Sequence, residues 1–369
     1  MKECNIFIVD IGGVTIKILG NNAVSMAIIN DLGAKLIADK INCDIYIEIS
    51  QINAKEYQPK VFSAKARMNF NDSAYFVDYI AEVSYLIEHL FDSKEVNIKI
   101  NVNKEGLKKR IKQFLGSKTV IEKNAILSYS LFWYVLHFEL LKNSKSFIHA
   151  GVFESKNGAT IIAGTGGCGK TSTLFKILEN NEVKYVSEDF GIIDSNSFCY
   201  YNPKSVSIYA SDMEFGQSIL HNFYNSFSIS EKFIWRFKRN ILGVNPMVKA
   251  KPDKLMNGRI AEKSKVMNVL YFVRNNDKNL KVKDINTADL VERVLDSSMR
   301  ELKTFNELLL LMRANAPQEF NIPTFESVRE TTKDIYLKAF SNTQNRIVYI
   351  PHKTTPDVLV SFLKENELL

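Results

Sequence analysis

The stretch Ala159-Thr-Ile-Ile-Ala-Gly-Thr-Gly-Gly-Cys-Gly-Lys-Thr171 decides how this chain is interpreted. It contains the pattern G-x-x-x-x-G-K-[ST], which marks a phosphate-binding loop when it follows a strand and opens a helix. Residues 159–163 have the composition of a buried strand, and residues 171–178 have that of a helix. Both flanks therefore fit the motif, whereas a simple Gly-rich turn would not need the Lys-Thr pair at its end.

The residue types in this loop suit a triphosphate. Glycines let the backbone turn so that N–H groups at the start of a helix converge on phosphate oxygens. The Lys170 side chain supplies positive charge to the β- and γ-phosphates, and the Thr171 hydroxyl can ligate Mg²⁺. The sequence therefore predicts ATP or GTP with Mg²⁺ as cofactors, bound by Gly164, Thr165, Gly166, Gly167, Cys168, Gly169, Lys170, Thr171 and Ser172.

Two adjacent carboxylates follow the next predicted strand. Residues 183–187 run into Glu188-Asp189, and Asp189 lies 19 residues after Lys170. Adjacent acids at a strand end often form only a solvated turn. A metal bound to phosphates, however, needs hard oxygen ligands, and phosphoryl transfer needs a group that orients or deprotonates the attacking hydroxyl. We therefore predict Thr171, Glu188 and Asp189 as metal ligands, and Lys170 and the two acids as catalytic residues.

His149 completes the predicted site. It lies fifteen residues before Gly164, in a strand-like segment that is expected to pair with the phosphate-loop strand. A lone histidine usually has a structural role. Beside a carboxylate pair and a polyphosphate, however, an imidazole can ligate the metal or donate to a phosphate oxygen, so His149 is predicted as a further catalytic residue.

The pattern of strand-like and helix-like segments divides the whole chain into three parts. Residues 1–145 are strand-rich and end in a helix, residues 146–315 alternate strand and helix, and residues 316–369 form a helix–strand–helix tail. This places the chain in the α/β class. Helices are predicted at 107–115, 123–141 and 327–340, and strands at 44–49, 74–80, 96–102 and 346–350.

The N-terminal segment allows two interpretations. Residues 6–10 and 14–19 are strand-like, and Gly12-Gly13 between them predicts a hairpin. The stretch from Asp10 to Lys17 also looks like the first phosphate loop of the sugar-kinase and actin superfamily, but the other loops of that superfamily are not evident.

Composition and charge narrow the class of protein. With 46% hydrophobic and 24% charged residues, the chain is that of a folded protein. The net charge of +7 favours anionic partners, nucleotides included, but no nucleic-acid module accompanies it, so nucleic acid is not expected as a partner. The apolar run 126–141 contains His137 and Glu139 and is too short for a membrane helix, so we predict a buried helix and no membrane partner.

The expected compartment is the cytoplasm. The N-terminal segment meets Asp10 before a secretory core could form, and the four cysteines show neither metal-ligand spacing nor a disulfide framework. The sequence does not indicate an oligomeric state, which leaves a homo-oligomer open.

Taken in order, these segments resemble one family. Phe147-Ile-His-Ala-Gly-Val152, the turn Asn157-Gly158, the loop Gly164–Thr171 and Tyr185-Val-Ser-Glu-Asp-Phe190 are similar to the nucleotide core of the HPr kinase/phosphorylase and phosphoenolpyruvate carboxykinase superfamily. Residues 265–273 and 286–295 resemble a later strand and helix of that core more loosely. The resemblance spans residues 146–315, while residues 1–145 look more like the lead-in of HPr-kinase-related proteins of bacterial biosynthetic clusters.

The family resemblance implies a mixed sheet and phosphoryl transfer to a hydroxyl or an acid. It implies that Lys170 and Thr171 bind phosphate and metal, that Asp189 ligates metal and that His149 lies beside them. The family usually has Asp-Asp where this chain has Glu188-Asp189, which puts the role of Glu188 as base in doubt. The signature of members that act on HPr is missing, and the chain is too short for a carboxykinase, so an HPr-kinase-related protein is expected rather than HPr kinase itself.

Two functions lead at this point, and a third, the reverse phosphorylase activity that removes phosphate from a modified protein, ranks below them. The first is a kinase that transfers the γ-phosphoryl group to a hydroxyl of a peptide, carrier protein or small metabolite. The second is a nucleotide-sensing module that orders its loops around the triphosphate without transfer. Residues 200–262 are expected to line the acceptor side, with Arg259 or a lysine in reach of a phosphate, through Tyr200, Tyr201, Tyr209, Lys249, Lys251, Lys254 and Arg259. The helix N-terminus is expected to lower the pKa of the Cys168 thiol.

Overall fold

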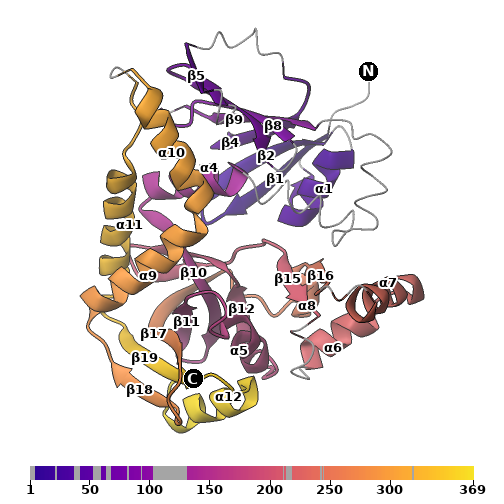
Figure 1. Ribbon diagram of the computed structural model, residues 1–369, viewed down its shortest axis with the longest axis vertical. Coiled ribbons are helices and arrows are strands. Elements are labelled where there is room, and N and C mark those ends of the chain that lie inside the picture. Colours follow the sequence, from indigo (N-terminus) through magenta and orange to yellow (C-terminus); the bar gives the residue numbers. More distant parts are fainter. Residues whose placement is uncertain are drawn as a thin grey trace. The chain divides into compact units, whose positions relative to one another are not determined.

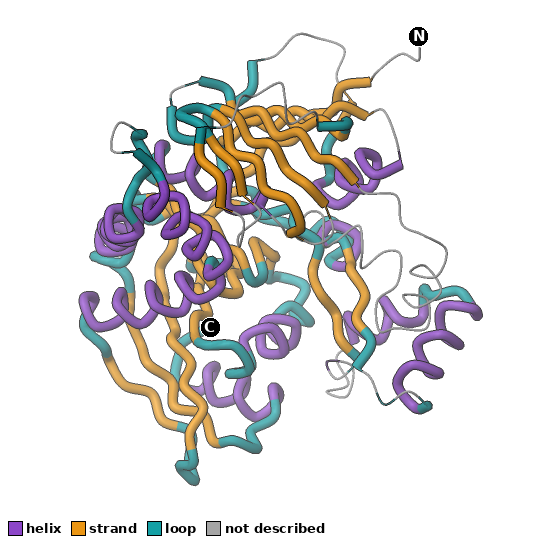
Figure 2. The backbone as a smooth tube through the Cα atoms, turned by 45° about the horizontal axis from the view of Figure 1, so that its top comes forward, coloured by secondary structure: helices purple, strands orange, loops and turns teal. Residues whose placement is uncertain are grey.

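The computed structural model describes most of the chain. The described residues are 5–20, 23–36, 42–52, 60–63, 68–80, 83–92, 94–102, 131–210, 212, 218–241, 243, 245–317 and 320–369. They form a mixed α/β protein whose sheets combine parallel and antiparallel strands, which confirms the predicted fold class (Figure 2).

The chain divides into two compact units. One comprises residues 1–143 and 302–330, and the other comprises residues 144–301 and 331–369. Residues 316–369, which the sequence pattern set apart as a tail, are therefore shared between the units. The division follows the packing, because residues 344–351 form a strand in the sheet of the second unit.

The first unit is built on one mixed sheet. Its strands pair in the order β3-β1-β2-β4-β9-β8-β7-β6-β5, parallel at β2–β4 and β4–β9 and antiparallel elsewhere. Its elements are β1 (Asn5–Ile11), β2 (Val14–Gly20), α1 (Ala23–Leu32), β3 (Lys35–Leu36), β4 (Ile45–Ile49), β5 (Val61–Ser63), β6 (Met68–Phe70), β7 (Ala74–Ile80), β8 (Val83–Glu88), β9 (Val96–Val102), α4 (Leu131–Lys142) and α10 (Lys303–Asn315).

The N-terminal hairpin forms as predicted. β1 and β2 pair in register around Gly12 and Gly13, which both have positive φ. The Asp10 carboxylate accepts the Gly13 N–H at 2.9 Å, so the side chain closes the turn. The predicted buried helix also appears as α4, whose residues 132–140 are all buried, while residues 126–130 and the helix predicted at 107–115 lie outside the described residues.

The second unit holds the phosphate loop. Its strands pair in the order β11-β10-β13-β14-β17-β19-β18, with β12 also against β10 and β11 also against β17. Its elements are β10 (Lys145–Ser155), β11 (Gly158–Gly164), α5 (Lys170–Ile177), β12 (Lys184–Ser187), β13 (Phe190–Asp194), β14 (Phe198–Tyr200), β15 (Val206–Tyr209), α6 (Ser218–Asn225), α7 (Ile229–Asn240), β16 (Met247–Ala250), α8 (Pro252–Leu255), β17 (Lys263–Asn275), β18 (Lys281–Asp284), α9 (Thr287–Glu301), β19 (Gln344–Pro351) and α12 (Pro356–Glu365) (Figure 1). Helix α11 (Phe325–Ala339) carries the chain from the first unit into the second.

Three adjacent strands fix where the loop lies. β10 pairs antiparallel with β11, and β11 pairs parallel with β17, which in turn pairs parallel with β19. Helix α5 packs over β10 and β11 with α12 beside it (Figure 1). The side chains of Leu174 and Phe175 are fully buried in the core beneath α5, and each contributes about 2–3 kcal/mol through burial of apolar surface. The loop between β11 and α5 is therefore held at both ends by core packing.

Candidate functional site

The loop between β11 and α5 has the backbone that the motif predicts. Gly164, Gly167 and Gly169 have φ of 147°, 80° and 98°, which residues with a side chain rarely adopt. At Gly164 an added Cβ would also lie 2.7 Å from the Phe272 carbonyl oxygen. Glycine is therefore required there both by conformation and by the close approach of β17.

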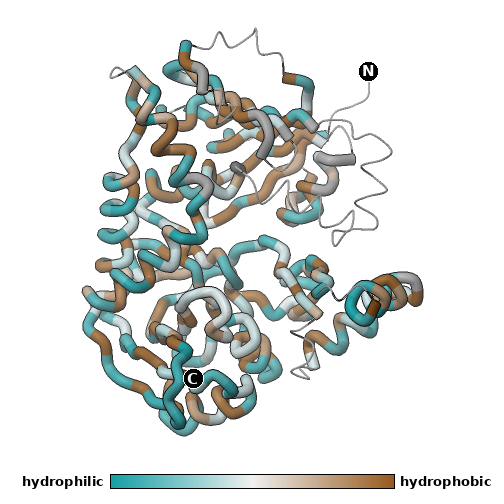
Figure 3. Tube along the Cα trace, in the orientation of Figure 1, coloured by the Kyte–Doolittle hydropathy of each residue, from teal (hydrophilic) through white to brown (hydrophobic). Residues whose placement is uncertain are grey.

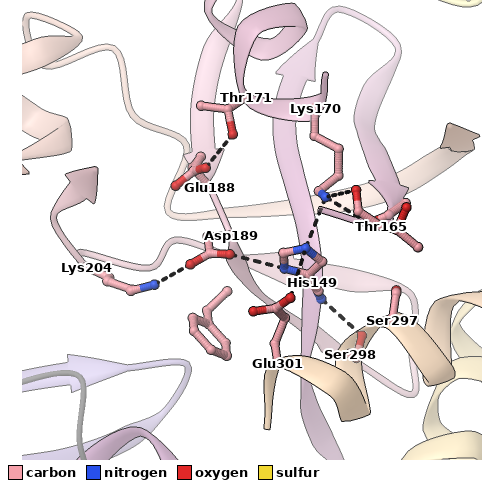
Figure 4. Close-up of polar contacts among 12 residues, drawn as sticks. His149, Thr165, Lys170, Thr171, Glu188, Asp189, Lys204, Ser297, Ser298 and Glu301 are labelled. Atoms are coloured by element: carbon pink, nitrogen blue, oxygen red, sulfur yellow. Dashed lines mark hydrogen bonds and ion pairs between the residues drawn. The ribbon is translucent and has the colours of Figure 1, made fainter. Parts of the chain in front are cut away.

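Lys170 lies over this loop rather than away from it. Its Nζ donates to the carbonyl oxygens of Gly164 at 2.8 Å and Thr165 at 3.1 Å, and it lies 3.0 Å from Nε2 of His149 (Figure 4). These three contacts engage all three N–H groups of the ammonium. A phosphate oxygen that binds Lys170 must therefore replace one of them.

A tight turn separates the two predicted acids. Asp189 has φ of 68°, and the Phe190 N–H donates to the Glu188 carbonyl oxygen at 2.8 Å, which closes a three-residue γ-turn between β12 and β13. Strained turns of this kind are concentrated at functional sites. The turn sends the two carboxylates in different directions, with Glu188 toward Thr171 and Asp189 toward His149 and Lys204 (Figure 4).

Glu188 is paired with the helix that follows the loop. Its Oε1 accepts a hydrogen bond from Thr171 Oγ1 at 2.7 Å. Burial, and after it the negative charge of Asp189, raise the pKa of Glu188 to about 7, although Lys204, the Thr171 hydrogen bond and Lys249 act in the opposite direction. Near neutral pH, Glu188 is therefore able to exchange a proton.

Asp189 is held as an anion. Burial alone would raise its pKa, but Lys204 and His149 outweigh burial and keep the pKa of Asp189 well below its ordinary value. Lys204 Nζ lies 2.7 Å from Oδ2, and His149 Nδ1 lies 3.1 Å from Oδ1. Each oxygen of the Asp189 carboxylate thus lies beside a nitrogen atom of a neighbouring side chain.

The lysine beside Asp189 is part of the core of the unit. The Lys204 side chain is only 3% exposed, and its Nζ lies 4.2 Å from the centre of the Phe190 ring. The Asn202 side chain accepts the Lys204 N–H at 3.0 Å and donates to the Phe190 carbonyl oxygen at 2.7 Å. The backbone before Lys204 is therefore tied to the strand that carries the acids.

Helix α9 supports the histidine. The His149 N–H donates to Ser298 Oγ at 3.1 Å, and Glu301 Oε1 lies 3.8 Å from His149 Nε2. Because Lys170 has only donors, the contact at Nε2 requires an unprotonated nitrogen there, which places the ring proton on Nδ1, toward Asp189. A continuous polar chain then runs from Lys170 through His149 and Asp189 to Lys204.

Arg274, at the end of β17, braces the other side of the loop. Its Nε donates to the Cys168 carbonyl oxygen at 3.3 Å, and Nη1 donates to the carbonyl oxygens of Pro351, His352 and Thr354 at 3.0, 2.7 and 3.3 Å. The residues after β19 are thereby fastened to the phosphate loop.

The structure brings all the predicted site residues together, on β10, the loop, α5 and the β12–β13 turn. Sequence reasoning missed Lys204, Arg274, Ser298 and Glu301. Arg274 could have been suspected, because it follows directly on the predicted strand 265–273. No pattern marks the other three, since their roles depend on packing between segments far apart in the chain.

Two expectations about individual residues are wrong. Arg259 does not face a phosphate site, because its guanidinium donates to the carbonyl oxygens of Leu178, Asn180 and Val183 behind α5. The Cys168 thiol is buried, and burial raises its pKa despite the nearby charge of Lys170. Desolvation outweighs the helix N-terminus at this position.

Only some of the residues that were expected to line the acceptor side interact with Glu188 and Asp189. Lys249 is close enough to lower the pKa of Glu188, and the acids raise the pKa of Tyr209, after burial and Asp212. Tyr200 instead donates to Asp194 at 2.6 Å, and Tyr201 packs against Tyr185. Within residues 200–262, Lys204 therefore contacts Asp189 directly, and the hairpin of β15 and β16 carries Tyr209 and Lys249, which interact electrostatically with the acids.

The donors that could hold Mg²⁺ are oxygen atoms of two residues. Among the described residues no cluster of three or more His, Cys, Asp and Glu side chains is arranged to hold a metal ion. Mg²⁺ at a nucleotide needs only one or two protein oxygens, and two neighbouring ligands at about 2.1 Å in octahedral geometry lie about 3 Å apart. Thr171 Oγ1 and Glu188 Oε1, at 2.7 Å, match that spacing, whereas Asp189 is occupied by Lys204 and His149.

Two comparisons with known proteins by sequence give no match for this chain. No protein-family profile matches it, and no curated protein is significantly similar to it. In the part of the chain that is described, no helix combines the length and the apolar character that crossing a membrane requires.

Proposed function

We propose that this protein is a phosphotransferase of the HPr-kinase-like kind, which binds ATP or GTP with Mg²⁺ at residues 164–171 and transfers the terminal phosphoryl group to a hydroxyl acceptor. The observation that carries the proposal is the joint arrangement of Lys170 over the loop and Thr171 against Glu188. The mixed pairing of β10, β11 and β17 around the loop supports the family resemblance.

Glu188 and Asp189 would have separate roles in the reaction. Thr171 and Glu188 would hold Mg²⁺, which when bound neutralises charge on the phosphates and orients them. Asp189, kept ionised by Lys204, would accept a hydrogen bond from the acceptor hydroxyl and position it. This assignment exchanges the roles expected from the sequence, where Asp189 was the metal ligand and Glu188 the base.

The phosphoryl transfer forms one bond, breaks one bond and releases one proton. The acceptor oxygen forms a bond to the γ-phosphorus, the bond from that phosphorus to the bridging oxygen breaks, and the nucleoside diphosphate leaves. The hydroxyl proton passes to Asp189 or, through it, to water. Lys170 stabilises the charge that develops on the transferred group and its leaving oxygen.

The test is transfer of γ-labelled phosphate from ATP and from GTP into material of the native host. We expect label in one acceptor with the wild type, and at least a hundredfold less with Lys170→Ala and with Asp189→Asn. Lys184→Ala removes an exposed lysine from the neighbouring strand β12 and should transfer like the wild type. Undiminished transfer by Lys170→Ala would refute the assignment.

The second function, a nucleotide-sensing module, is favoured by one observation. Both acids already have protein partners, Glu188 in Thr171 and Asp189 in Lys204 and His149. A sensor would bind nucleotide with Mg²⁺ and lose that binding in Lys170→Ala, but would transfer no label to any acceptor. Calorimetric titration with both nucleotides, beside the transfer assay, separates the two functions.

A further inference from the structure

A helical insert extends from the hairpin of β15 and β16, which carries Tyr209 and Lys249. Helices α6 and α7 are inserted between β15 and β16 and form a helical hairpin of their own (Figure 1). The rings of Tyr224 and Phe227 and the buried Trp235 pack together, with centres 5.4 to 6.4 Å apart. A capping box of Ser228 and Glu231 opens α7. The insert is therefore an ordered element with an inner face of its own.

The outer face of α7 is apolar and exposed. Ile229, Phe233, Phe237 and Ile241 recur every fourth residue and are 88%, 70%, 43% and 70% exposed. This spacing places them along one face of the helix, where Ile234 joins them. The rings of Phe233 and Phe237 stack on each other at 6.4 Å. Single exposed apolar residues are ordinary, but a contiguous stripe of this kind marks an interaction site.

The surroundings of this apolar stripe are basic. Arg236 and Arg239 are exposed on α7 itself, and Glu231 is engaged by the capping box (Figure 3 shows the mixture of hydrophobic and hydrophilic residues along α7). Residues 228–241 contain four lysines and arginines, of which Lys238 is buried, and one acidic residue, Glu231. The surface therefore complements a partner that is both apolar and acidic.

The insert is tied to the candidate site within the same compact unit. Its two ends continue into β15 and β16, which carry Tyr209 and Lys249 beside the acids. The Ser218 N–H, at the start of α6, also donates to Glu179 Oε1 at 2.6 Å, just beyond the end of α5. A polypeptide that lies on α7 would thus be bound by an element whose ends join the hairpin that carries Tyr209 and Lys249.

We propose that the outer face of α7 docks the phosphoryl acceptor, and that this acceptor is a polypeptide with an amphipathic segment rich in acidic residues. The identification of the bound polypeptide as the acceptor rests on the proposed phosphotransfer. A bilayer fits less well, because the exposed arginines lie to one side of the apolar stripe, whereas a membrane-bound helix meets lipid headgroups along both sides.

The test uses the full-length protein and a fluorescent amphipathic peptide with leucines on one face and glutamates beside them. We expect saturable binding by fluorescence anisotropy, weakened by salt, and at least tenfold weaker for Phe233→Ser/Phe237→Ser and for Arg236→Glu/Arg239→Glu. A control variant, Leu310→Ser/Val358→Ser, removes exposed apolar residues elsewhere and should bind like the wild type. Equal binding of a scrambled peptide, or unchanged binding by both α7 variants, would overturn the proposal.

Two other occupants are tested alongside the peptide. Sedimentation with phosphatidylserine vesicles that depends on Phe233 and Phe237 would overturn the proposal in favour of a membrane surface. A dimer in analytical ultracentrifugation that the same variant dissociates would overturn it in favour of a second copy. Lys170→Ala should keep the peptide affinity, so peptide binding is measured independently of nucleotide binding. If the wild type transfers no label, the proposed function fails while the docking surface stands.

Discussion

Replacing Lys204 with Met tests whether the Lys204–Asp189 pair organises the site. The variant keeps most of the side-chain volume but removes the ammonium from a position that is 3% exposed, 2.7 Å from Asp189. Removing one partner of a buried pair typically costs about 3–5 kcal/mol, because the other charge stays buried without compensation. Since the Asp189 side chain is 30% exposed and keeps His149, we expect a loss of about 2–3 kcal/mol for Lys204→Met.

The loss should depend on pH in a defined direction. The pKa of Asp189 is depressed in the folded protein, so its contribution to stability is complete above the unfolded value of about 3.9 and is lost as the pH falls further. The difference between wild type and Lys204→Met is therefore complete at pH 7, still near its maximum at pH 5, and becomes smaller only below about pH 4. Because the two compact units need not unfold together, hydrogen exchange of residues 186–194 is the appropriate local measurement.

The controls make the result specific. Lys281→Met breaks an ion pair of similar length, 3.0 Å, whose side chains are 52% and 41% exposed, and it should change local exchange little because water screens the pair. Adding Asp189→Asn to Lys204→Met should recover much of the loss, because no charge is then left buried. A Lys204→Met effect no larger than that of Lys281→Met, or strict additivity in the double variant, would refute the reasoning.

Two further predictions concern Glu188 and Cys168. Glu188→Gln should stabilise the second unit by about 1–2 kcal/mol at pH 8 and hardly at all at pH 5, because the raised pKa of Glu188, about 7, makes its ionised form costly only at the higher pH; equal hydrogen exchange effects at both pH values would contradict this. Iodoacetamide at pH 7.5 should leave Cys168 unmodified even without nucleotide, because the thiol is buried with a raised pKa; rapid labelling in peptide mass spectrometry would show the opposite.

Much of the second unit could be predicted because its signals are local. The phosphate loop, its strand and its helix appear where the G-x-x-x-x-G-K-[ST] pattern placed them, at β11 and α5. The pairing of the His149 strand with β11 also followed from chain order, because a short turn leaves antiparallel neighbours. The turn was predicted at Asn157-Gly158, and the structure places it at Lys156-Asn157, with Gly158 already in β11. Glycine patterns, strand composition and short connections all act over a few residues, so one sequence suffices to reveal them.

The electrostatic environment could not be predicted in the same way. Lys204 reaches Asp189 across 15 residues, and Ser298 reaches His149 across 149 residues, so neither contact leaves a local pattern. Cys168 was expected to have a lowered pKa from the helix N-terminus alone, but its burial depends on how β17 and the loop pack. Effects that depend on tertiary burial can oppose a local rule and outweigh it.

The presence of Glu rather than Asp at position 188 is explained by the turn that follows it. The γ-turn at Asp189 points the two side chains apart, so residue 188 must reach Thr171 while residue 189 stays near His149. An aspartate at 188 would retract the carboxylate by about 1.5 Å, one carbon–carbon bond, and lengthen the 2.7 Å contact accordingly. The extra methylene thus keeps Glu188 beside the Thr171 hydroxyl, where burial raises its pKa, while Lys204 lowers that of Asp189. Neighbouring carboxylates whose environments drive their pKa values apart are the usual basis for separate roles in catalysis, and here the separation is produced by one turn and one methylene.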